Sequence, residues 1–258
     1  MMESRSEERI VDNHCTLITG ASSGIGREIA KGLSAERRLI LNGRDEKRLE
    51  ETREACSSPE RHLVWPQALD RVADLQRGFT ELLARHQVRV DSYVHCAGTH
   101  KVLPLRSIEI DYALEVLNTN FTSAFALMSV LVKKKVNDQK LRSVVFVSSI
   151  ASQFGAKGMS IYAASKGALD ALMRSLAVEL APDVRVNSVL PGAIKTEMTK
   201  AIFARPEVEE RFKRDYPLGV GEPDDIVHIV EFLLSERARW ITGQQLIIDG
   251  GRTVNITA

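Results

Sequence analysis

The stretch CTLITGASSGIGREIAKGLSAE (residues 15–36) predicts a β-strand, a glycine-rich turn and a helix in direct succession. The apolar run CTLITG (15–20) indicates a strand that ends in glycine, and GIGREIAKGLSAE (24–36) indicates a helix. Glycines let the backbone turn tightly and approach a pyrophosphate, while a helix start offers free N–H groups and the positive end of its dipole. This stretch therefore favours a nucleotide site at the beginning of an α/β fold.

The glycine spacing leaves a second interpretation open, because it is G-x-x-x-G-x-G and not G-x-G-x-x-G. A tight turn between a strand and a helix would use the same residues without binding a ligand. The position of the turn, after the first strand and before the first helix, favours the cofactor site. The residues expected to bind a dinucleotide here are Gly20, Ser22, Ser23, Gly24, Ile25 and Gly26.

Short apolar runs alternate with longer helical patterns through the rest of the chain, which indicates βαβ units and a parallel sheet covered on both faces. We predict one doubly wound Rossmann-type α/β domain over residues 1–258, with seven strands. The run LVWPQAL is the weakest strand candidate, because Pro66 cannot donate to a ladder. A long helical stretch is expected at 110–135. The further strands are expected at residues 38–43, 63–69, 90–98, 143–149, 184–192 and 244–251.

Two segments are expected to lie outside the packed core. The polar residues 1–10 are expected to fray. Residues 195–221 are charged, contain two prolines and follow a predicted strand end, on the side of the sheet where ligands bind in such folds. We expect short helices there that form a lid over the substrate. Four apolar side chains in this segment suggest an apolar part of the ligand, as would any docked helix: Met198, Ile202, Phe203 and Phe212.

The composition argues against several classes of function. Of 258 residues, 44% are hydrophobic and 27% charged, and 35 Lys+Arg against 34 Asp+Glu give a net charge of +1. This balance indicates neither a nucleic-acid nor a membrane partner. Cys15, Cys56 and Cys96 show no metal-ligand spacing, so no metal site is predicted. Their odd number and the lack of a secretory signal favour a reducing, cytoplasmic location.

The end of the second predicted strand bears on the choice of cofactor. A dinucleotide site usually carries an acidic residue about 20 positions after the glycines, where it binds the ribose 2′-OH. Gly43 stands at that position here, and Arg44 follows it. A guanidinium suits a 2′-phosphate, which favours NADP(H) over NAD(H). The alternative is that Arg44 is an ordinary surface residue at a helix start and that Asp45 binds the ribose.

Tyr162 and Lys166 are four residues apart in SIYAASKGALDALMRSLAVELA (160–181), which predicts a largely buried helix. That spacing puts both side chains on one helix face. Free tyrosine titrates near ~10, and a cation one turn away favours the phenolate and lowers the pKa. Lys166 is therefore expected to tune Tyr162 for the proton transfer that a carbonyl reduction needs. On its own, such a pair could be a chance arrangement on a helix surface.

Seven features follow one another in a fixed order: TGASSGIG, CAG (96–98), Asn120 in NTNFTSAF, Ser149 in FVSSIAS, YAASK (162–166), PGAIKT and ITGQQLIIDGG. In this order they resemble the short-chain dehydrogenase/reductase family over nearly the whole chain. The resemblance implies that Tyr162 is the acid in reduction and the base in oxidation. It also implies that Lys166 holds the ribose hydroxyls of the nicotinamide nucleoside.

Two of the implied catalytic positions have close neighbours. Ser149 ends the fifth predicted strand, where its hydroxyl can stabilise charge on the substrate oxygen. Ser148 would face the other side of the sheet, and the family spacing selects Ser149. Capping of the strand end suits Ser148 and Ser152 better than Ser149.

Asn120 is a poor helix former within a helical stretch. The resemblance implies that it kinks the helix and supports a water relay to Lys166, whereas Asn118 would face elsewhere. The resemblance also implies that Asp70 binds the adenine, although Asp70 could equally cap the following helix. The remaining residues implied to contact the cofactor are Ala97, Gly98, Pro191, Gly192, Ile194 and Thr196.

The chain departs from the family after the fourth predicted strand. The family often shows Asn-Asn-Ala-Gly there, and this chain has His95, Cys96, Ala97 and Gly98. Loss of the second Asn removes a side-chain amide near the adenosine ribose. No role is assigned to His95 or to His100.

The predicted function is an NADP(H)-dependent oxidoreductase that acts on a carbonyl or secondary alcohol, and the chain looks most like the 3-oxoacyl-[acyl-carrier-protein] reductases. Lys140 and Arg142 could dock an acidic carrier or could be solvated loop charges. The alternative function is a non-catalytic dinucleotide-binding sensor or scaffold on the same fold. The family is commonly tetrameric, so a homotetramer is expected.

Overall fold

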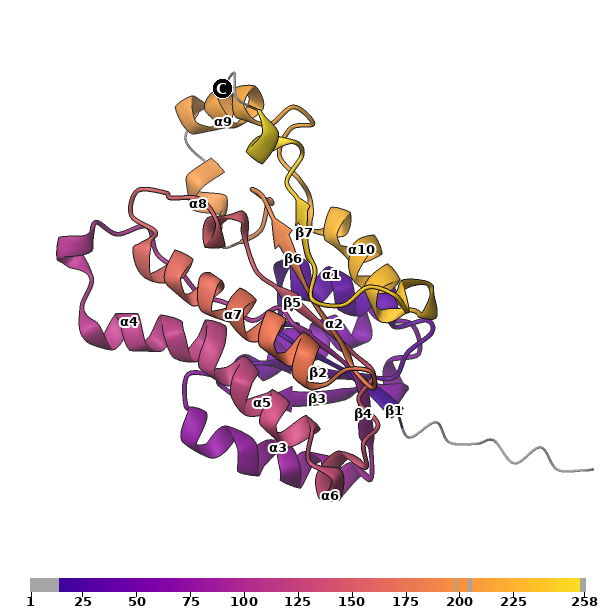
Figure 1. Ribbon diagram of the computed structural model, residues 1–258. Coiled ribbons are helices and arrows are strands. Elements are labelled where there is room, and N and C mark those ends of the chain that lie inside the picture. Colours follow the sequence, from indigo (N-terminus) through magenta and orange to yellow (C-terminus); the bar gives the residue numbers. More distant parts are fainter. Residues whose placement is uncertain (1–13, 198, 204–205, 256–258) are drawn as a thin grey trace, which may run out of the picture.

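Seven parallel strands form the centre of the molecule in a computed structural model that describes residues 14–197, 199–203 and 206–255. The strand order is β3-β2-β1-β4-β5-β6-β7, which confirms the predicted doubly wound sheet (Figure 1). The segment expected to fray, 1–10, lies outside the described residues, as does Met198. The strands are β1 (His14–Thr19), β2 (Leu39–Gly43), β3 (Leu63–Pro66), β4 (Arg89–His95), β5 (Ser143–Val147), β6 (Arg185–Pro191) and β7 (Gln245–Ile248).

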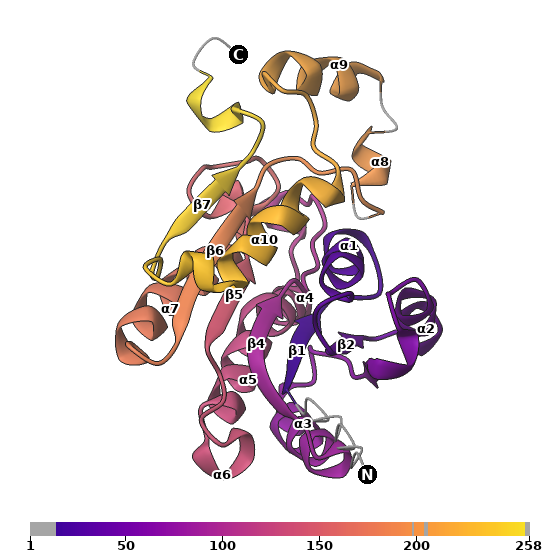
Figure 2. The same ribbon diagram turned by 90° about the vertical axis from the view of Figure 1, so that its right-hand side faces the viewer.

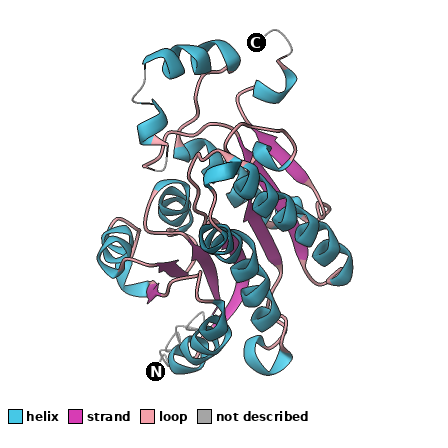
Figure 3. Ribbon diagram, turned by 90° about the vertical axis from the view of Figure 1, so that its left-hand side faces the viewer, coloured by secondary structure: helices cyan, strands magenta, loops and turns pink. Residues whose placement is uncertain are grey.

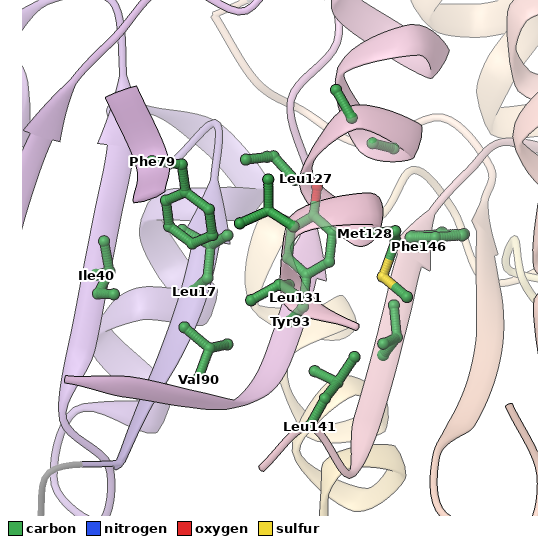
Figure 4. Packing of buried hydrophobic residues seen from close by; sticks show 14 of the residues in the cluster. Leu17, Ile40, Phe79, Val90, Tyr93, Leu127, Met128, Leu131, Leu141 and Phe146 are labelled. Carbon is green, nitrogen blue, oxygen red and sulfur yellow. The ribbon is translucent and has the colours of Figure 1, made fainter. Parts of the chain in front are cut away.

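Helices cover both faces of the sheet, as Figure 3 shows by colour. One face carries α3 (Val72–His86), α5 (Ser123–Leu131) and α7 (Ser160–Glu179), and the other carries α1 (Gly24–Leu33), α2 (Glu46–Glu54) and α10 (Val227–Leu234). Each face has its own apolar cluster, because successive side chains of a strand point to opposite sides. Leu17 and Tyr93 belong to the first cluster, drawn in Figure 4, and their neighbours Ile18 and Val94 belong to the second.

The strand that contains Pro66 is short and lies at the edge of the sheet. Strand β3 pairs only with β2, and Pro66 is its last residue. An edge position tolerates proline because one side of the strand needs no ladder hydrogen bonds. The sheet therefore accommodates the residue that made this the weakest predicted strand.

The long helix expected over residues 110–135 is interrupted. Helix α4 (Ile110–Leu117) passes into a π-helical turn at Asn118–Thr122, α5 follows, and α6 (Lys134–Asn137) is separate. A π-helical turn inserts an extra residue into the helix and often marks a functional position. Asn120 lies in this turn and is fully buried.

Residues 195–221 leave the sheet after β6 and return to their starting point. Lys195 N–H donates to the Gly221 carbonyl at 2.9 Å, and Gly221 N–H donates to the Ala193 carbonyl at 3.0 Å. Between these bonds lie α8 (Lys200–Phe203) and α9 (Pro206–Asp215). Figure 2 shows both helices beyond the carboxyl ends of the strands. The two ends of the excursion are thus joined by backbone hydrogen bonds.

Across the described ranges, no helix combines the length and the apolar character that crossing a membrane requires. Within the same ranges, Cys15, Cys56 and Cys96 form no disulfide.

Candidate active site

A cavity of about 1210 Å³ lies at the carboxyl ends of the strands, between the glycine-rich turn and residues 195–221. Asp70 and Asn120 are the two sequence-predicted site residues that are absent from its lining. The predicted residues that line it are Gly20, Ser22, Ser23, Gly24, Ile25, Gly26, Arg44, Ala97, Gly98, Ser149, Tyr162, Lys166, Pro191, Gly192, Ile194 and Thr196.

The glycine-rich turn is shaped by close backbone contacts. Gly20 has a positive φ of +70°, and a Cβ added there would lie 2.8 Å from the backbone N of Ala97. A Cβ at Gly26 would lie 2.3 Å from the Gly20 carbonyl oxygen. Glycine is therefore required at both positions for steric reasons. These contacts leave the N-terminus of α1 facing the cavity, as a phosphate site requires.

Buried side-chain oxygens of Asn42 and Asp70 lack a hydrogen-bond partner among the described residues, and of these two residues only Asn42 belongs to the cavity lining. Asn42 Nδ2 donates to the carbonyls of Trp65 and Gln67, both at 3.1 Å, which leaves Asn42 Oδ1 buried without a hydrogen-bond partner among the described residues. Asp70 Oδ1 is in the same situation. Orphaned buried acceptors are costly in isolation. Asn42 Oδ1 suits an N–H or O–H donor of a bound ligand, so the cavity lining fits a dinucleotide.

Asp70 does not cap the helix that follows it. The N-cap of α3 is Arg71, and no side chain caps this helix end. The capping alternative is therefore wrong. Asn42 is a candidate binding residue that sequence reasoning missed, since nothing in LILNG separates a core strand residue from one that faces a ligand.

Lys166 lies one turn after Tyr162 on α7, and both lie against the end of β5. The Lys166 ammonium donates to the Val147 carbonyl at 2.8 Å and lies 5.8 Å from the centroid of the Tyr162 ring. Only 3% of Lys166 is exposed. Burial lowers its pKa to about 8, while Cys96 and Asp170 act in the opposite direction. At neutral pH this lysine is still mostly charged.

The pKa of Tyr162 is shifted in the direction opposite to the one expected from the sequence. Burial raises it above the ordinary value of 10.0, and a hydrogen bond with Ser149 only partly offsets that effect. The free-energy cost of removing the phenolate from water is larger than the stabilisation that the Ser149 hydrogen bond provides. The phenol is therefore fully protonated at neutral pH.

Ser149 has two hydrogen-bonding roles. Its hydroxyl bonds Tyr162, and its oxygen accepts the backbone N–H of Ala151 at 3.2 Å, as the N-cap of the 3₁₀ turn Ile150–Ser152. The expectation that capping suits Ser148 and Ser152 better is wrong. Ser148 instead donates to the Lys166 carbonyl at 3.3 Å, and Ser152 Oγ is buried without a hydrogen-bond partner among the described residues.

Asn120 connects the π-helical turn to both walls of the cavity. Its Oδ1 accepts the Thr99 N–H at 2.8 Å, and its Nδ2 donates to the Thr99 carbonyl at 3.1 Å and to Ser165 Oγ at 2.9 Å. The backbone after β4 and the first turns of α7 are thus fixed to one side chain. Asn118, its rival in the sequence, is half-buried at the start of the same turn.

His95 is a second buried connector, to which the sequence assigned no role. Its Nδ1 lies 2.9 Å from Thr19 Oγ1 and 2.8 Å from the Tyr93 hydroxyl, and its Nε2 lies 3.2 Å from the Asn120 carbonyl oxygen. A carbonyl only accepts, so Nε2 carries the proton, and the single lone pair of Nδ1 accepts from one of the two hydroxyls at a time. Burial, with the nearby Lys166 charge, lowers the pKa of His95 to about 3, so the ring is neutral.

Two further side chains with titratable groups line the cavity beside Tyr162. The His100 ring stacks on the Tyr162 ring, with 4.8 Å between centroids and a tilt of 39°. Burial lowers the pKa of His100, and burial raises that of Cys96 to about 12. Both groups are neutral at neutral pH. The local sequence HCAGTH contains both residues, but the ring contact of His100 with Tyr162 and the place of Cys96 in the same cavity arise only in the folded chain.

Known proteins resemble this chain in sequence and structure. Residues 20–253 match a family model described as Enoyl-(Acyl carrier protein) reductase. The 3-oxoacyl-[acyl-carrier-protein] reductase of Aquifex aeolicus is 33% identical over 243 residues, which cover 92% of this chain and 96% of that protein. The L-rhamnose 1-dehydrogenase (NAD(P)(+)) of Azotobacter vinelandii is 32% identical over 251 residues, with coverages of 93% and 96%.

The structure of a 4-hydroxyisoleucine dehydrogenase complexed with NADH superimposes with a TM-score of 0.86 at 28% identity. The match covers 94% of this chain and 99% of that one.

Replacement of His95 tests its burial as a neutral ring. An unfolded histidine titrates near ~6.5, and the folded value is about 3. Protons therefore bind the unfolded chain more strongly between these values, and the free energy of unfolding falls by up to about 1.4 kcal/mol per pH unit as the pH decreases. We expect His95→Asn to make this dependence shallower in urea unfolding between pH 6 and pH 4.

His228→Asn is the matched control for this experiment, because His228 lies on the exposed side of α10. It should leave the pH dependence of wild type unchanged. Equal slopes for His95→Asn and wild type would contradict the assignment of a neutral, buried imidazole.

Proposed function

Starting from the fact that the chain belongs to the short-chain dehydrogenase/reductase family, we propose that it is an NADP(H)-dependent enzyme that interconverts a carbonyl and a secondary alcohol. The family is one of oxidoreductases that transfer hydride with a nicotinamide dinucleotide. The observation that carries the proposal is the hydrogen-bonded pair Ser149 and Tyr162 beside the buried Lys166 ammonium, all lining one cavity with the glycine-rich turn.

The proposed chemistry follows from the protonation states of these groups. The bound dinucleotide would supply or accept the hydride. The protonated Tyr162 phenol donates its proton to the substrate oxygen, which Ser149 also hydrogen-bonds. The phenolate that remains is stabilised by the Lys166 charge, which is held in place by the Val147 carbonyl. Asn120 holds Ser165 on α7, between these two residues, and is proposed as a positioning residue.

The preference for NADP(H) is proposed from the end of β2. Arg44 is exposed and lines the cavity, and Gly43 leaves no carboxylate at the position that would bind a ribose hydroxyl. A Cβ at Gly43 would lie 3.1 Å from Ser22 Oγ, so the β2 end and the glycine-rich turn are in close contact. The names of the relatives mention NADH in one case and NAD(P)(+) in another. The proposed preference for NADP(H) therefore rests on Gly43 and Arg44 of this chain and not on its relatives.

The substrate is proposed to have an apolar part, with a 3-oxoacyl thioester as the first candidate. Residues 195–221 are proposed as its lid. The rings of Phe203 and Phe212 of this segment are tilted by 52° with 5.2 Å between their centroids, and they line the cavity together with Phe154 and Met159. Aromatic walls of this kind bind apolar groups without a specific polar partner.

A homotetramer is proposed from two separate sets of exposed apolar side chains. One set lies on α4, α5 and α7 and includes Leu114, Phe125 and Val178, the last of which is 82% exposed. The other lies around the β7 edge and includes Trp240, which is 91% exposed, and Ile247. Two distinct faces of this kind can form two different two-fold interfaces, which together close a tetramer.

Tyr162→Phe tests the proposed reaction. Loss of the proton donor should lower kcat for NADPH-dependent reduction of an acetoacetyl thioester by about 10²–10⁴-fold. NADPH binding, followed by its fluorescence, should remain unchanged. Tyr112→Phe removes a hydroxyl outside the cavity lining and should behave like wild type. An undiminished rate in Tyr162→Phe would exclude the proposed acid.

Arg44→Ala tests the cofactor preference. We expect the Kd for NADPH to rise about 10–100-fold and that for NADH to change less than about twofold, because only NADPH loses a charge-assisted contact. Lys47→Ala, at an exposed position outside the cavity lining, removes a nearby positive charge and should have little effect. If wild type binds NADH as tightly as NADPH at moderate ionic strength, the assignment to Arg44 is wrong.

Light scattering tests the proposed assembly. The mass should be about four times the 28.7 kDa of one chain. Val178→Glu and Trp240→Glu place a charge on different faces, so each should reduce the mass to that of a dimer. Ala84→Glu, on the exposed side of α3, should remain tetrameric. A wild-type protein with the mass of one chain would contradict the proposal.

A further inference from the structure

Arg252 lines the cavity with a guanidinium that is poorly partnered. It begins the 3₁₀ turn Arg252–Val254 after β7, and its side chain is 35% exposed. Within the ranges that the structure describes, its guanidinium makes no hydrogen bond and has one ion pair, 3.9 Å from Asp215 Oδ2. Arg185, another partly buried arginine, donates to the carbonyls of Leu233 and Ser235. Arg252 therefore retains donors that its own chain does not use.

Near Arg252, the two carboxylates of Asp215 and Asp249 are outnumbered by three guanidinium groups, including that of Arg252. The Asp215 carboxylate, whose side chain is 8% exposed, lies 3.4 Å from Arg211 Nε, 3.4 Å from Arg214 Nε and 3.9 Å from Arg252 Nη2. One carboxylate thus faces three guanidinium groups. Arg211 and Arg252 line the cavity, and Arg214 does not. An anion in the cavity would balance the excess charge and satisfy unused donors.

The backbone that carries Arg252 is fixed on both sides. Asp249 accepts the N–H of Gly251 at 3.0 Å and that of Thr253 at 2.7 Å. Asn255 Nδ2 donates to the Asp215 carbonyl at 3.3 Å, so the C-terminal turn is joined to the end of α9. Because this backbone is already fixed, binding of a ligand has only the Arg252 side chain left to order.

Arg252 follows the edge strand β7 and is therefore far from the expected phosphate positions of a dinucleotide. Arg44 follows β2 and Arg252 follows the β7 region, five strand intervals away, which is about 24 Å at ~4.8 Å per interval. The glycine-rich turn follows β1, four intervals from β7. The phosphates of a dinucleotide bound at the glycine-rich turn would therefore lie far from Arg252, which leaves the substrate as the source of an anion there.

We propose that Arg252, together with Arg211, binds an anionic group of the substrate, a carboxylate or a phosphate, at the end of the cavity formed by α9 and the C-terminal turn. The substrate then combines this group with an apolar part against Phe203 and Phe212. The inference rests on the proposed function only in taking the cavity as the substrate site.

Binding of octanoate and octanamide tests the proposal without turnover. The two ligands share their chain and differ in charge. With saturating NADPH present, we expect calorimetry to give an octanoate Kd about tenfold lower than that of octanamide, as one charge-assisted contact provides. Arg252→Met should abolish this difference while NADPH binding remains normal, which shows that the variant is folded.

Arg214→Met is the matched control, because it removes an equal charge and an ion pair to the same carboxylate outside the cavity. It should keep the preference for octanoate. Absence of a preference in wild type, its survival in Arg252→Met, or its equal loss in Arg214→Met would each overturn the proposal.

Two substrate pairs distinguish the source of the anionic group. Acetoacetate and its ethyl ester differ in the carboxylate, and acetoacetyl-coenzyme A and acetoacetyl-N-acetylcysteamine differ in the phosphates. A fall of kcat/KM in Arg252→Met for the acid alone assigns a carboxylate, and a fall for the coenzyme A thioester alone assigns a phosphate. Unchanged ratios in both pairs would overturn the proposal. Failure to reduce any of the four would count against the proposed 3-oxoacyl substrate, while the octanoate experiment would still decide the anion site.

Discussion

The hydrogen bond from His95 to the Asn120 carbonyl joins the elements that frame the cavity. Through Nδ1 the same ring reaches Thr19 at the end of β1 and Tyr93 on β4. Through the Asn120 side chain the connection continues to Thr99 and to Ser165 on α7. The start of the glycine-rich turn and the helix that carries Tyr162 are therefore held at a fixed separation by neutral groups only. A neutral connection of this kind adds no charge beside the Lys166 ammonium.

Features that depend on short stretches of sequence were predictable. The strand, turn and helix of residues 15–36 and the shared face of Tyr162 and Lys166 follow from local periodicity and spacing. Features that depend on distant contacts were not. The raised pKa of Tyr162 comes from burial by several segments, and the cap formed by Ser149 depends on a 3₁₀ turn that the sequence did not indicate. The partners of His95 and Arg252 lie up to 76 residues away and had no visible signal.

Positively charged side chains lie in three separate parts of the cavity. Arg44 lies in the part beside the glycine-rich turn, the buried Lys166 ammonium in the part beside Tyr162, and Arg211 and Arg252 in the part formed by α9 and the turn after β7. Between the last two parts the walls are aromatic. Cys96, His95 and His100 are neutral near Tyr162, so Lys166 supplies the dominant local charge where proton transfer is proposed. Electrostatic effects are strongest at such partly desolvated positions.

The backbone hydrogen bonds that join Ala193 and Lys195 to Gly221 close residues 195–221 into a loop of its own. Because the ends are held together, the entropy of closing the loop depends only weakly on its length. Insertions, deletions and sequence changes within it need not disturb β6 or the sheet. The sequence of this segment can therefore change in evolution while the rest of the fold is kept. Asp215 contacts Arg252 and Asn255. A change of residues 195–221 that alters the substrate would therefore require matching changes in residues 252–255.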